Sequence, residues 1–370
     1  MNPLVELHAF GQSFWYDNIR RDYLTNGTIK SLIDNDGMRG MTSNPTIFDK
    51  AIAGTDDYDA QIAELTAQGA DINSIYEALV ISDIQAACDL FAPVFKESNG
   101  GDGFVSLEVS PYLAHDTEGT IHEARRLHAA VGRPNLMIKV PATPEGIPAI
   151  RALTGEGLNI NITLMFNMAH YEAVSKAYID GLRDWMGRGG DPRQIVSVAS
   201  FFVSRVDTIV DKHLAALGDP AALALMGQSA VASSRLVYKR YKEIFRDPAG
   251  EFADLAVAGA NVQRLLWAST STKNPAYSDT LYIAELIGPD TVTTVTPATI
   301  EAFRDHGQVA DTLEGDLDDA RHVLDQLAEF KIDFNDLTEQ LLVDGVAAFT
   351  KSFDSLMASI AAKGESLRKG

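Results

Sequence analysis

Eight short runs of apolar and β-branched residues alternate with helical stretches along the chain, and this alternation strongly limits the possible folds. The runs are Ser13 to Ile19, Gly40 to Asn44, Phe104 to Ser110, Leu136 to Pro141, Asn159 to Phe166, Val196 to Val203, Arg264 to Thr270 and Thr291 to Thr296. Helical patterns lie between them, such as Ile75 to Phe91 and Met168 to Met186, and Ser74 with Glu77 predicts a capping box before the first. Eight strands alternating with helices predict an α/β fold, a parallel sheet closed as a (β/α)8 TIM barrel.

A doubly wound open sheet is the structural alternative, but no glycine-rich loop follows an early strand to support it. No linker, low-complexity tract or repeat divides the chain, so we expect residues 1–370 to form a single domain.

The chain is longer than a simple barrel of about 250 residues, so it carries additional helices. The surplus is expected in Ser233 to Asn261 and in the tail after Pro297, with Thr296-Pro297 as a helix start. Four apolar residues near the end recur at helical spacing: Phe349, Phe353, Leu356 and Ile360. They predict a C-terminal helix packed near the barrel mouth rather than a partner-binding helix.

Composition excludes several functional classes. A net charge of -20 disfavours binding to nucleic acid or to an anionic membrane surface. The single cysteine, Cys88, lies in a helical segment, where we expect it to be buried; one cysteine permits no intramolecular disulfide. The N-terminus lacks the pattern of a secretory signal, and no run of roughly 18 apolar residues predicts a membrane span. We therefore expect a cytoplasmic protein, and its oligomeric state, monomer or homodimer, stays open.

Lys139 lies in Leu136-Met137-Ile138-Lys139-Val140-Pro141, an otherwise apolar run. An unpaired ammonium in an apolar interior is costly, so this lysine must reach a partner or be held partly unprotonated. A neutral amine on a rigid strand can attack a ketone to form a Schiff base.

Polar side chains alternate with apolar ones in the third and fifth predicted strands, and the polar faces are expected to point to the barrel axis. They are Ser106, Glu108 and Ser110 in the third run, and Asn159, Asn161 and Thr163 in the fifth. Glu108 can form a structural ion pair with a lysine or orient a water for proton transfer, and Thr163 can hold the same water. Active sites of such barrels lie at the C-terminal strand ends, where these residues converge.

Two residues at other strand ends have two interpretations each. Asp17 is either a helix cap or a residue at a strand end that faces the predicted pocket. Asn44, in Thr42-Ser43-Asn44-Pro45, belongs to a turn and can also point its amide at a substrate hydroxyl.

A hydroxyl, an aromatic ring and a guanidinium follow the sixth strand at Ser200, Phe202 and Arg205, and Lys273 follows the seventh. Arginine suits bidentate phosphate binding, and barrels often bind phosphate near their last strands. Taken singly, either cation is more typical of a solvated surface.

Metal chemistry has little support, because the eight histidines are scattered without ligand spacing beside a carboxylate. His115 alone follows a strand near the pocket, and we interpret it as a surface residue. We expect no metal and no cofactor.

The chain resembles the transaldolase family, specifically its longer bacterial form. The resemblance rests on the order of these segments: Thr42-Ser43-Asn44-Pro45, Ser106-Leu107-Glu108-Val109, Ile138-Lys139-Val140-Pro141-Ala142-Thr143, Asn161-Ile162-Thr163-Leu164, Ser200-Phe201-Phe202-Val203-Ser204-Arg205, and a final helix beginning at Asp344-Gly345-Val346.

The resemblance implies reversible transfer of a dihydroxyacetone unit between sugar phosphates in the non-oxidative pentose phosphate pathway. Lys139 would form the imine with a ketose phosphate, Asp17 would be the acid/base, and Glu108 with Thr163 would hold the catalytic water. The implied substrate-binding residues are Asn44, Ser200, Phe202, Arg205 and Lys273. Two departures from the family stand out: Ser110 replaces a common aspartate, and Lys273 replaces an arginine of shorter relatives.

Two rival functions remain. A fructose-6-phosphate aldolase releases free dihydroxyacetone, and that branch has Gln and Tyr where this chain has Glu108 and Phe202. A non-catalytic sugar-phosphate-binding barrel would be expected to lack Lys139 or Glu108.

Overall fold

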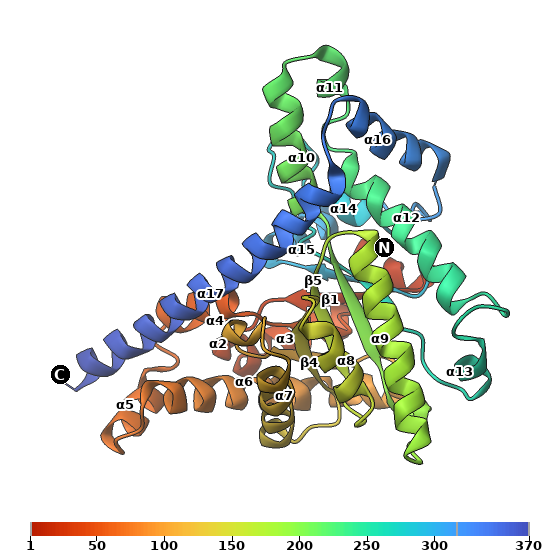
Figure 1. Cartoon of the computed structure of the whole chain (residues 1–370). Coiled ribbons are helices and arrows are strands. Elements are labelled where there is room, and N and C mark those ends of the chain that lie inside the picture. The colour runs from red at the N-terminus through yellow and green to blue at the C-terminus, as the bar shows by residue number, and fades with distance from the viewer. Residues whose placement is uncertain (1, 316, 369–370) are drawn as a thin grey trace.

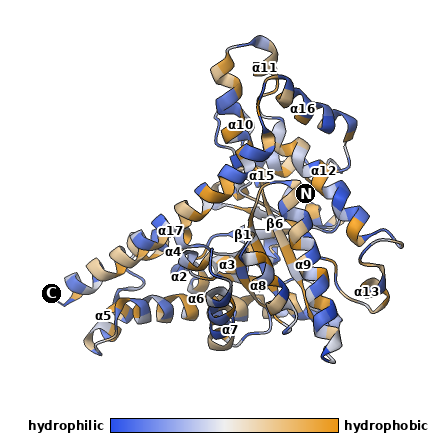
Figure 2. Ribbon diagram, viewed as in Figure 1, coloured by the Kyte–Doolittle hydropathy of each residue, from blue (hydrophilic) through white to orange (hydrophobic). Residues whose placement is uncertain are grey.

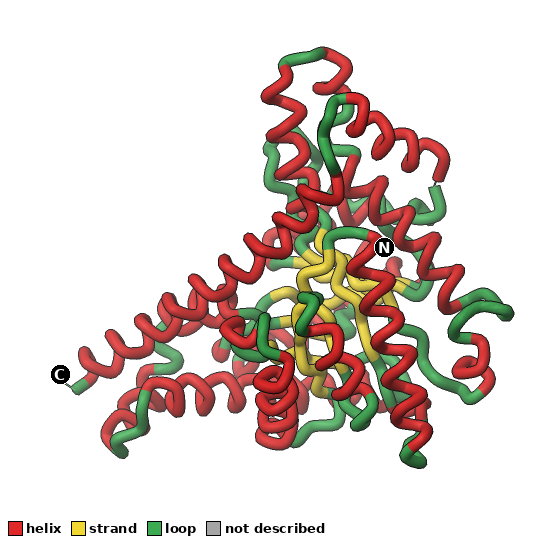
Figure 3. Tube along the Cα trace, in the orientation of Figure 1, coloured by secondary structure: helices red, strands yellow, loops and turns green. Residues whose placement is uncertain are grey.

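Eight parallel strands close into a barrel at the centre of the molecule (Figure 3). The structure is a computed structural model that describes residues 2–315 and 317–368. The strands are β1 (Gln12–Asp17), β2 (Gly40–Thr42), β3 (Phe104–Glu108), β4 (Leu136–Pro141), β5 (Ile160–Met165), β6 (Ser197–Phe202), β7 (Arg264–Ala268) and β8 (Thr291–Val295). Each pairs in parallel with the next, and β8 pairs with β1. The predicted (β/α)8 barrel is confirmed, and closure rules out the open sheet.

The eight strands were predicted at the right places, but several predicted ends were one or two residues too long. β1 ends at Asp17 rather than Ile19, and β2 ends at Thr42 rather than Asn44. Asn44 is extended, yet its side chain already caps the following helix. Extended, apolar residues next to a strand therefore match the strand pattern without joining the ladder of hydrogen bonds.

Helices of the strand-to-strand connections surround the barrel (Figure 1). They include α2 (Arg21–Thr25), α3 (Thr28–Asp36), α4 (Pro45–Gly54), α5 (Asp59–Ala67), α6 (Ile72–Glu97), α7 (Thr117–Val131), α8 (Gly146–Thr154), α9 (Met168–Gly187), α10 (Ser204–Leu217), α11 (Pro220–Ala224), α12 (Ser229–Phe245), α13 (Ala253–Val257) and α14 (Leu281–Ala284). Short 3-10 turns are η1 (Leu7–Phe10), η2 (Pro111–Leu113) and η3 (Pro192–Gln194), and α1 (Pro3–Glu6) precedes the barrel. After β8 come α15 (Pro297–His306), α16 (Leu317–Glu329) and α17 (Phe334–Leu367).

Helix α6 begins earlier than predicted and lies against the barrel. Its N-cap is Asp71, whose carboxylate accepts a hydrogen bond from the Ser74 N–H at 2.8 Å, so the predicted Ser74 capping box is wrong. Among the described residues, this is the one helix long and apolar enough, by length and composition, to cross a membrane. It carries the buried Asp83, which forms an ion pair with Arg21 at 2.8 Å, and Cys88 is buried on it as predicted. This buried ion pair and the packing of α6 on the barrel are typical of a core helix.

The surplus residues form two groups of helices. The stretch Ser233 to Asn261 lies in α12 and α13, although α12 already begins at Ser229. Thr296 is the N-cap residue and Pro297 the first residue of α15, as predicted. Helix α16 packs on α12 through Ala232, Ala320 and Val323, and both helices lie on the same side of the barrel as α10 and α11 (Figure 1).

The C-terminal helix α17 crosses the molecule from the α16 side past α4 to its own end (Figure 1). It begins after Asp333, which caps it by accepting from two backbone N–H groups, so the predicted start at Asp344-Gly345-Val346 is wrong. The predicted apolar stripe is confirmed, since Phe349, Phe353, Leu356 and Ile360 are all buried. Hydrophobic and hydrophilic residues alternate along this helix (Figure 2).

Gly345 lets α17 approach the barrel closely. A Cβ atom at this position would lie 2.8 Å from Leu164 Cδ2 and 3.6 Å from Arg205 Nη1. Leu164 follows Thr163 on β5 and has a positive φ of 60°, so its backbone has few alternatives.

We predict that Gly345→Val lowers the free energy of unfolding by about 2 kcal/mol, because its methyl groups overpack this contact. Urea denaturation measures the change. The matched control is Gly187→Val at the end of α9, where nothing lies within 4 Å of the added Cβ. Equal effects of the two substitutions would show that the helix does not depend on this close approach.

Candidate active site

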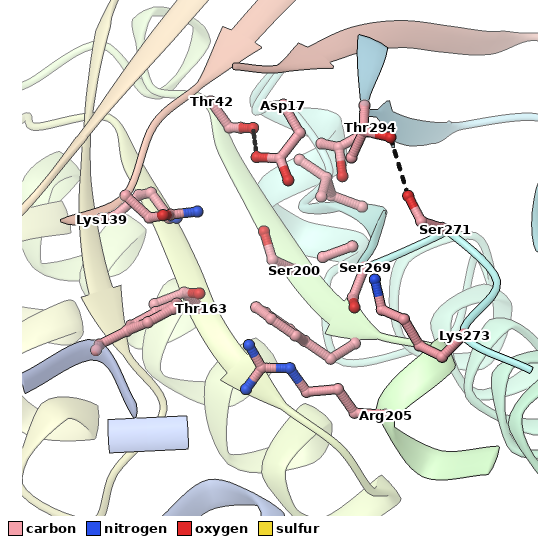
Figure 4. Close-up of a pocket in the computed structure, with 16 residues that line it drawn as sticks. Asp17, Thr42, Lys139, Thr163, Ser200, Arg205, Ser269, Ser271, Lys273 and Thr294 are labelled. Atoms are coloured by element: carbon pink, nitrogen blue, oxygen red, sulfur yellow. Dashed lines mark hydrogen bonds between the residues drawn. The ribbon is translucent and has the colours of Figure 1, made fainter. Parts of the chain in front are cut away.

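A cavity of about 120 Å³ opens at the C-terminal ends of the strands, beside α17 (Figure 4). It gathers residues from all strands except β3, or from the loops that follow them. The lining residues are Asp17, Thr42, Asn44, Lys139, Thr163, Ser200, Phe202, Arg205, Leu266, Ala268, Ser269, Ser271, Lys273, Thr294, Thr296 and Phe349. The structure therefore brings together every predicted site residue except Glu108, which lies just behind Lys139.

Lys139 is buried on β4 with two oxygen partners. Its Nζ donates a hydrogen bond to the Ser43 carbonyl at 3.1 Å and lies 3.4 Å from Glu108 Oε2. The exposed fractions of the Lys139 and Glu108 side chains are 6% and 7%. Because a charge-assisted hydrogen bond is usually 2.7–2.9 Å long, the Lys139–Glu108 contact is a loose ion pair. The contacts with Ser43 and Glu108 hold the Lys139 amine in place, and Lys139 still lines the cavity.

Glu108 is aligned with Lys139 in the ladder between β3 and β4. Burial raises the pKa of Glu108, and the positive charge of Lys139 lowers it again, with a smaller raising effect from Asp17. Glu108 borders two small cavities, of about 10 and 20 Å³, that it shares with Tyr76 and Phe353. The sequence predicted that Glu108 would face the main cavity. In the structure Glu108 does not line that cavity and lies beside the Lys139 amine.

Two buried oxygens near Lys139 have no hydrogen-bond partner among the described residues. They are Glu108 Oε2 and Thr163 Oγ1. Buried polar atoms are normally satisfied by protein or by ordered water. Each of these two oxygens can therefore take a further hydrogen bond.

Part of the predicted polar face is buried in the barrel interior, at Ser106, Asn161 and Thr163. Asn161 Nδ2 donates to Ser106 Oγ at 3.0 Å, and Ser200 Oγ donates to Asn161 Oδ1 at 2.7 Å. Asn161 is fully buried and fixes the Ser200 hydroxyl at the cavity floor. Sequence analysis noted the inward face of Asn161 but gave it no role, although the alternation of β5 carried the signal.

Asp17 belongs to the pocket rather than to a helix cap. Thr42 Oγ1 donates a hydrogen bond to Asp17 Oδ1 at 2.7 Å (Figure 4), and the N-cap residue of α2 is Arg20. Thr42 was not predicted as a site residue, because its contact depends on the register between β1 and β2.

Asn44 both caps a helix and lies at the cavity. Its Oδ1 accepts the Ile47 N–H at 3.0 Å and caps α4, and the residue also lines the cavity. The amide nitrogen has no hydrogen-bond partner within residues 2–315 and 317–368, so it is available to a ligand.

Two cations lie at one end of the cavity. Arg205, in the first turn of α10, is half-buried, and its guanidinium carbon lies 5.3 Å from the Phe202 ring centre and 5.9 Å from that of Phe349. Burial lowers the pKa of Arg205, while Asp17 and Glu108 raise it. The guanidinium is therefore partly shielded from solvent by the two rings, and no carboxylate of the described residues forms an ion pair with it.

Lys273 is more exposed, at the edge of the cavity (Figure 4). Partial burial lowers the pKa of Lys273, as do the positive charges of Arg205 and Lys50, and Asp17 opposes them. The two cations leave a local positive charge without an ion-paired partner in the described structure, in a protein with a net charge of -20. An anionic group of a ligand would neutralise this charge.

Other lining residues escaped sequence analysis because nothing marks them locally. Ser269, Ser271, Thr294 and Thr296 add hydroxyl groups from the ends of β7 and β8, and Phe349 reaches the site from α17. Within the described part of the chain, no group of three or more His, Cys, Asp or Glu residues could hold a metal ion. His115 is exposed and pairs with Glu145 at 3.1 Å, which confirms it as a surface residue.

The fold and the site define a class of barrel enzyme in which a buried lysine and two acidic groups adjoin a cationic subsite. Residues 14–360 match the family described as transaldolase/fructose-6-phosphate aldolase, and the chain belongs to this family of enzymes acting on sugar phosphates.

The chain is 46% identical to transaldolase 2 of Nostoc punctiforme over 370 residues, covering 97% of each protein. It is 47% identical to the transaldolase of Thiobacillus denitrificans, covering 97% of this chain and 100% of the relative. Identity to the transaldolase of Mycobacterium bovis is 47%, with 96% of each covered. The family resemblance inferred from the sequence is confirmed.

We predict that Lys139→Met destabilises the fold in a pH-dependent way. Without the lysine charge, the pKa of Glu108 rises further, so its ionised form is disfavoured in the folded state. A raised carboxyl pKa in the folded state lowers stability once the pH exceeds the ordinary value of about 4 in the unfolded chain, and the loss is complete above the raised folded-state pKa. The variant should lose little below about pH 4 and about 3 kcal/mol at higher pH.

Urea titrations at several pH values measure this loss. In the double variant Lys139→Met/Glu108→Gln, the additional pH dependence should vanish, since the titrating group is gone. A loss that is independent of pH in the single variant would contradict the coupling of the two side chains.

Proposed function

We propose that the protein transfers a dihydroxyacetone unit from sedoheptulose 7-phosphate to glyceraldehyde 3-phosphate, giving erythrose 4-phosphate and fructose 6-phosphate. This is the transaldolase reaction of the non-oxidative pentose phosphate pathway. The observation that carries the proposal is the position of Lys139, whose amine is buried beside Glu108 and borders a cavity with unpaired cations. A buried amine on a rigid strand is suited to attack a carbonyl carbon.

In the first half of the reaction, Lys139 Nζ attacks C2 of the ketose as a neutral amine. The carbinolamine loses its hydroxyl group as water, which leaves a protonated imine. A water held between Glu108 and Thr163 moves the protons of this step; the free hydrogen-bonding capacity of Glu108 Oε2 and Thr163 Oγ1 supports that role.

Asp17 serves bond cleavage. Its carboxylate takes the proton of the C4 hydroxyl, the C3–C4 bond breaks, and the bonding electrons pass to the imine, which becomes an enamine. The aldehyde leaves, and the enamine then attacks the acceptor aldehyde, whose oxygen receives the proton from Asp17. Water hydrolyses the imine that results, which releases the new ketose and restores the Lys139 amine. The hydrogen bond from Thr42 holds the carboxylate in one orientation for both transfers.

The remaining predicted residues bind the substrate. Asn44 and Ser200 donate to sugar hydroxyls, and Phe202 excludes water from the enamine. Arg205 and Lys273 receive the phosphate, which neutralises their charges. Since Lys273 is a single ammonium, its contact is that of a point charge rather than a bidentate fork.

The proposal also covers the setting of the reaction. We infer one domain over residues 1–370, a monomer or homodimer in the cytoplasm, and no cofactor. The net charge of -20 supports the absence of nucleic-acid and membrane partners.

Fructose-6-phosphate aldolase activity is the alternative within the same family. The difference is the fate of the enamine: in transfer it attacks an acceptor aldehyde, whereas in cleavage it is protonated and the resulting imine is hydrolysed by water, which releases free dihydroxyacetone. Glu108 and the apolar Phe202 at the cavity favour transfer, because no phenol hydroxyl stands there to position a hydrolytic water.

The ratio of transfer to cleavage tests the proposal. With fructose 6-phosphate and erythrose 4-phosphate, the protein should form sedoheptulose 7-phosphate much faster than it releases dihydroxyacetone. Phe202→Tyr should shift the ratio toward cleavage, and Phe166→Tyr, on the neighbouring ring 5.3 Å away, is the matched control. Release of dihydroxyacetone as the main wild-type product would contradict the proposal, and an unchanged ratio in Phe202→Tyr would contradict the role of the ring.

A further inference from the structure

The two cations of the site come from separate connections and repel each other. Arg205 begins α10 after β6, whereas Lys273 lies between β7 and α14. The charge of Arg205 lowers the pKa of Lys273, after the larger effect of burial. Neither cation forms an ion pair with a described carboxylate, so other contacts must hold them at one end of the cavity.

The Lys273 loop is tied to α10 by a buried aspartate. Tyr277 Oη donates a hydrogen bond to Asp211 Oδ2 at 2.7 Å, and Asp211 Oδ1 accepts the Gly227 N–H at 2.9 Å. Asp211 is only 8% exposed, and it lies on the same helix as Arg205. The bond therefore joins the helix that carries one cation to the loop that carries the other.

Tyr277 fits closely where it is held. Gly227 has a positive φ of 78°, and a Cβ atom there would lie 2.8 Å from Tyr277 Cζ. The Tyr277 ring therefore packs directly on the Gly227 backbone, and this contact fixes the orientation of the ring and the position of its hydroxyl group.

Two hydrogen bonds within the loop couple the backbone position of Tyr277 to that of Lys273. Thr272 Oγ1 donates to the Ser278 carbonyl at 2.7 Å, and the Tyr277 N–H donates to the Asn274 carbonyl at 3.1 Å. Lys273 lies inside the turn that these bonds close. A displacement of Tyr277 would therefore move the backbone of Lys273.

A second aspartate of α10 repeats the arrangement at the far end of the loop. Tyr282 Oη donates to Asp207 Oδ2 at 2.9 Å, and the Ala230 N–H donates to Asp207 Oδ1 at 2.8 Å. Both side chains are almost fully buried, and burial raises the pKa of Asp207 to about 6. Burying a carboxylate is costly unless it is hydrogen-bonded, and here both oxygens are.

We propose that Asp211–Tyr277 and Asp207–Tyr282 form a clamp that fixes the Lys273 loop on α10 and so sets the spacing of the two cations that receive the substrate phosphate. Tyr277, Asp211, Tyr282 and Asp207 are positioning residues, since none of them lines the cavity. The inference rests on the proposed phosphate-binding role of Arg205 and Lys273.

The test compares phosphorylated and unphosphorylated donors. Tyr277→Phe removes one hydrogen bond to a carboxylate, so we expect KM for fructose 6-phosphate to rise about tenfold. The kcat should change little, and kcat/KM for unphosphorylated fructose should stay at its wild-type value. Asp211→Asn should act in the same direction, and inorganic phosphate should inhibit both variants more weakly.

Two further variants complete the design. Tyr178→Phe is the matched control, because this buried tyrosine donates to the Asn261 carbonyl at 2.8 Å, far from the Lys273 loop, and should affect neither donor. Arg205→Ala tests the phosphate role itself. If Arg205→Ala is selective for the phosphorylated donor and Tyr277→Phe is not, the clamp is wrong. If Arg205→Ala also affects both donors equally, the phosphate-binding role is wrong.

Discussion

The loose ion pair between Lys139 and Glu108 is the contact on which the site depends. Two opposite charges side by side in a closed barrel stabilise each other only if the remaining polar atoms find partners, because each charge has lost its water. The Ser43 carbonyl supplies one such partner for the amine. The 3.4 Å separation leaves the amine without a tight bond to the carboxylate, so that it can react with a carbonyl.

Elements that are distant from one another in the sequence contribute to the site or hold its parts in place. Helix α17 reaches the site through Gly345 and Phe349, more than a hundred residues after Arg205. The aspartates of α10 hold the loop after β7 through tyrosine hydroxyls. Catalysis requires reacting groups placed within fractions of an ångström, and these contacts restrict the movement of the loop that carries Lys273 relative to Arg205.

Sequence analysis could predict the barrel and most site residues because their signals are local. The alternation of Asn159, Asn161 and Thr163 follows from the pleat of a single strand. The apolar run around Lys139 can likewise be recognised in the sequence without knowing which strands pair with it. The Thr42–Asp17 bond and the position of Glu108 behind Lys139 depend on strand register and barrel closure. The Asp211–Tyr277 contact joins residues 66 positions apart, and no local pattern marks it. The start of α17 was missed because an aspartate cap at Asp333 precedes the family-like segment.

Chemical trapping of the imine tests the central claim that Lys139 is the nucleophile. The protein is treated with fructose 6-phosphate and borohydride, and the reduced adduct is located by intact-mass measurement and peptide mapping. The account predicts one adduct per chain, on the peptide that contains Lys139, and none in Lys139→Met. No adduct, or an adduct on another lysine such as Lys273, would contradict it.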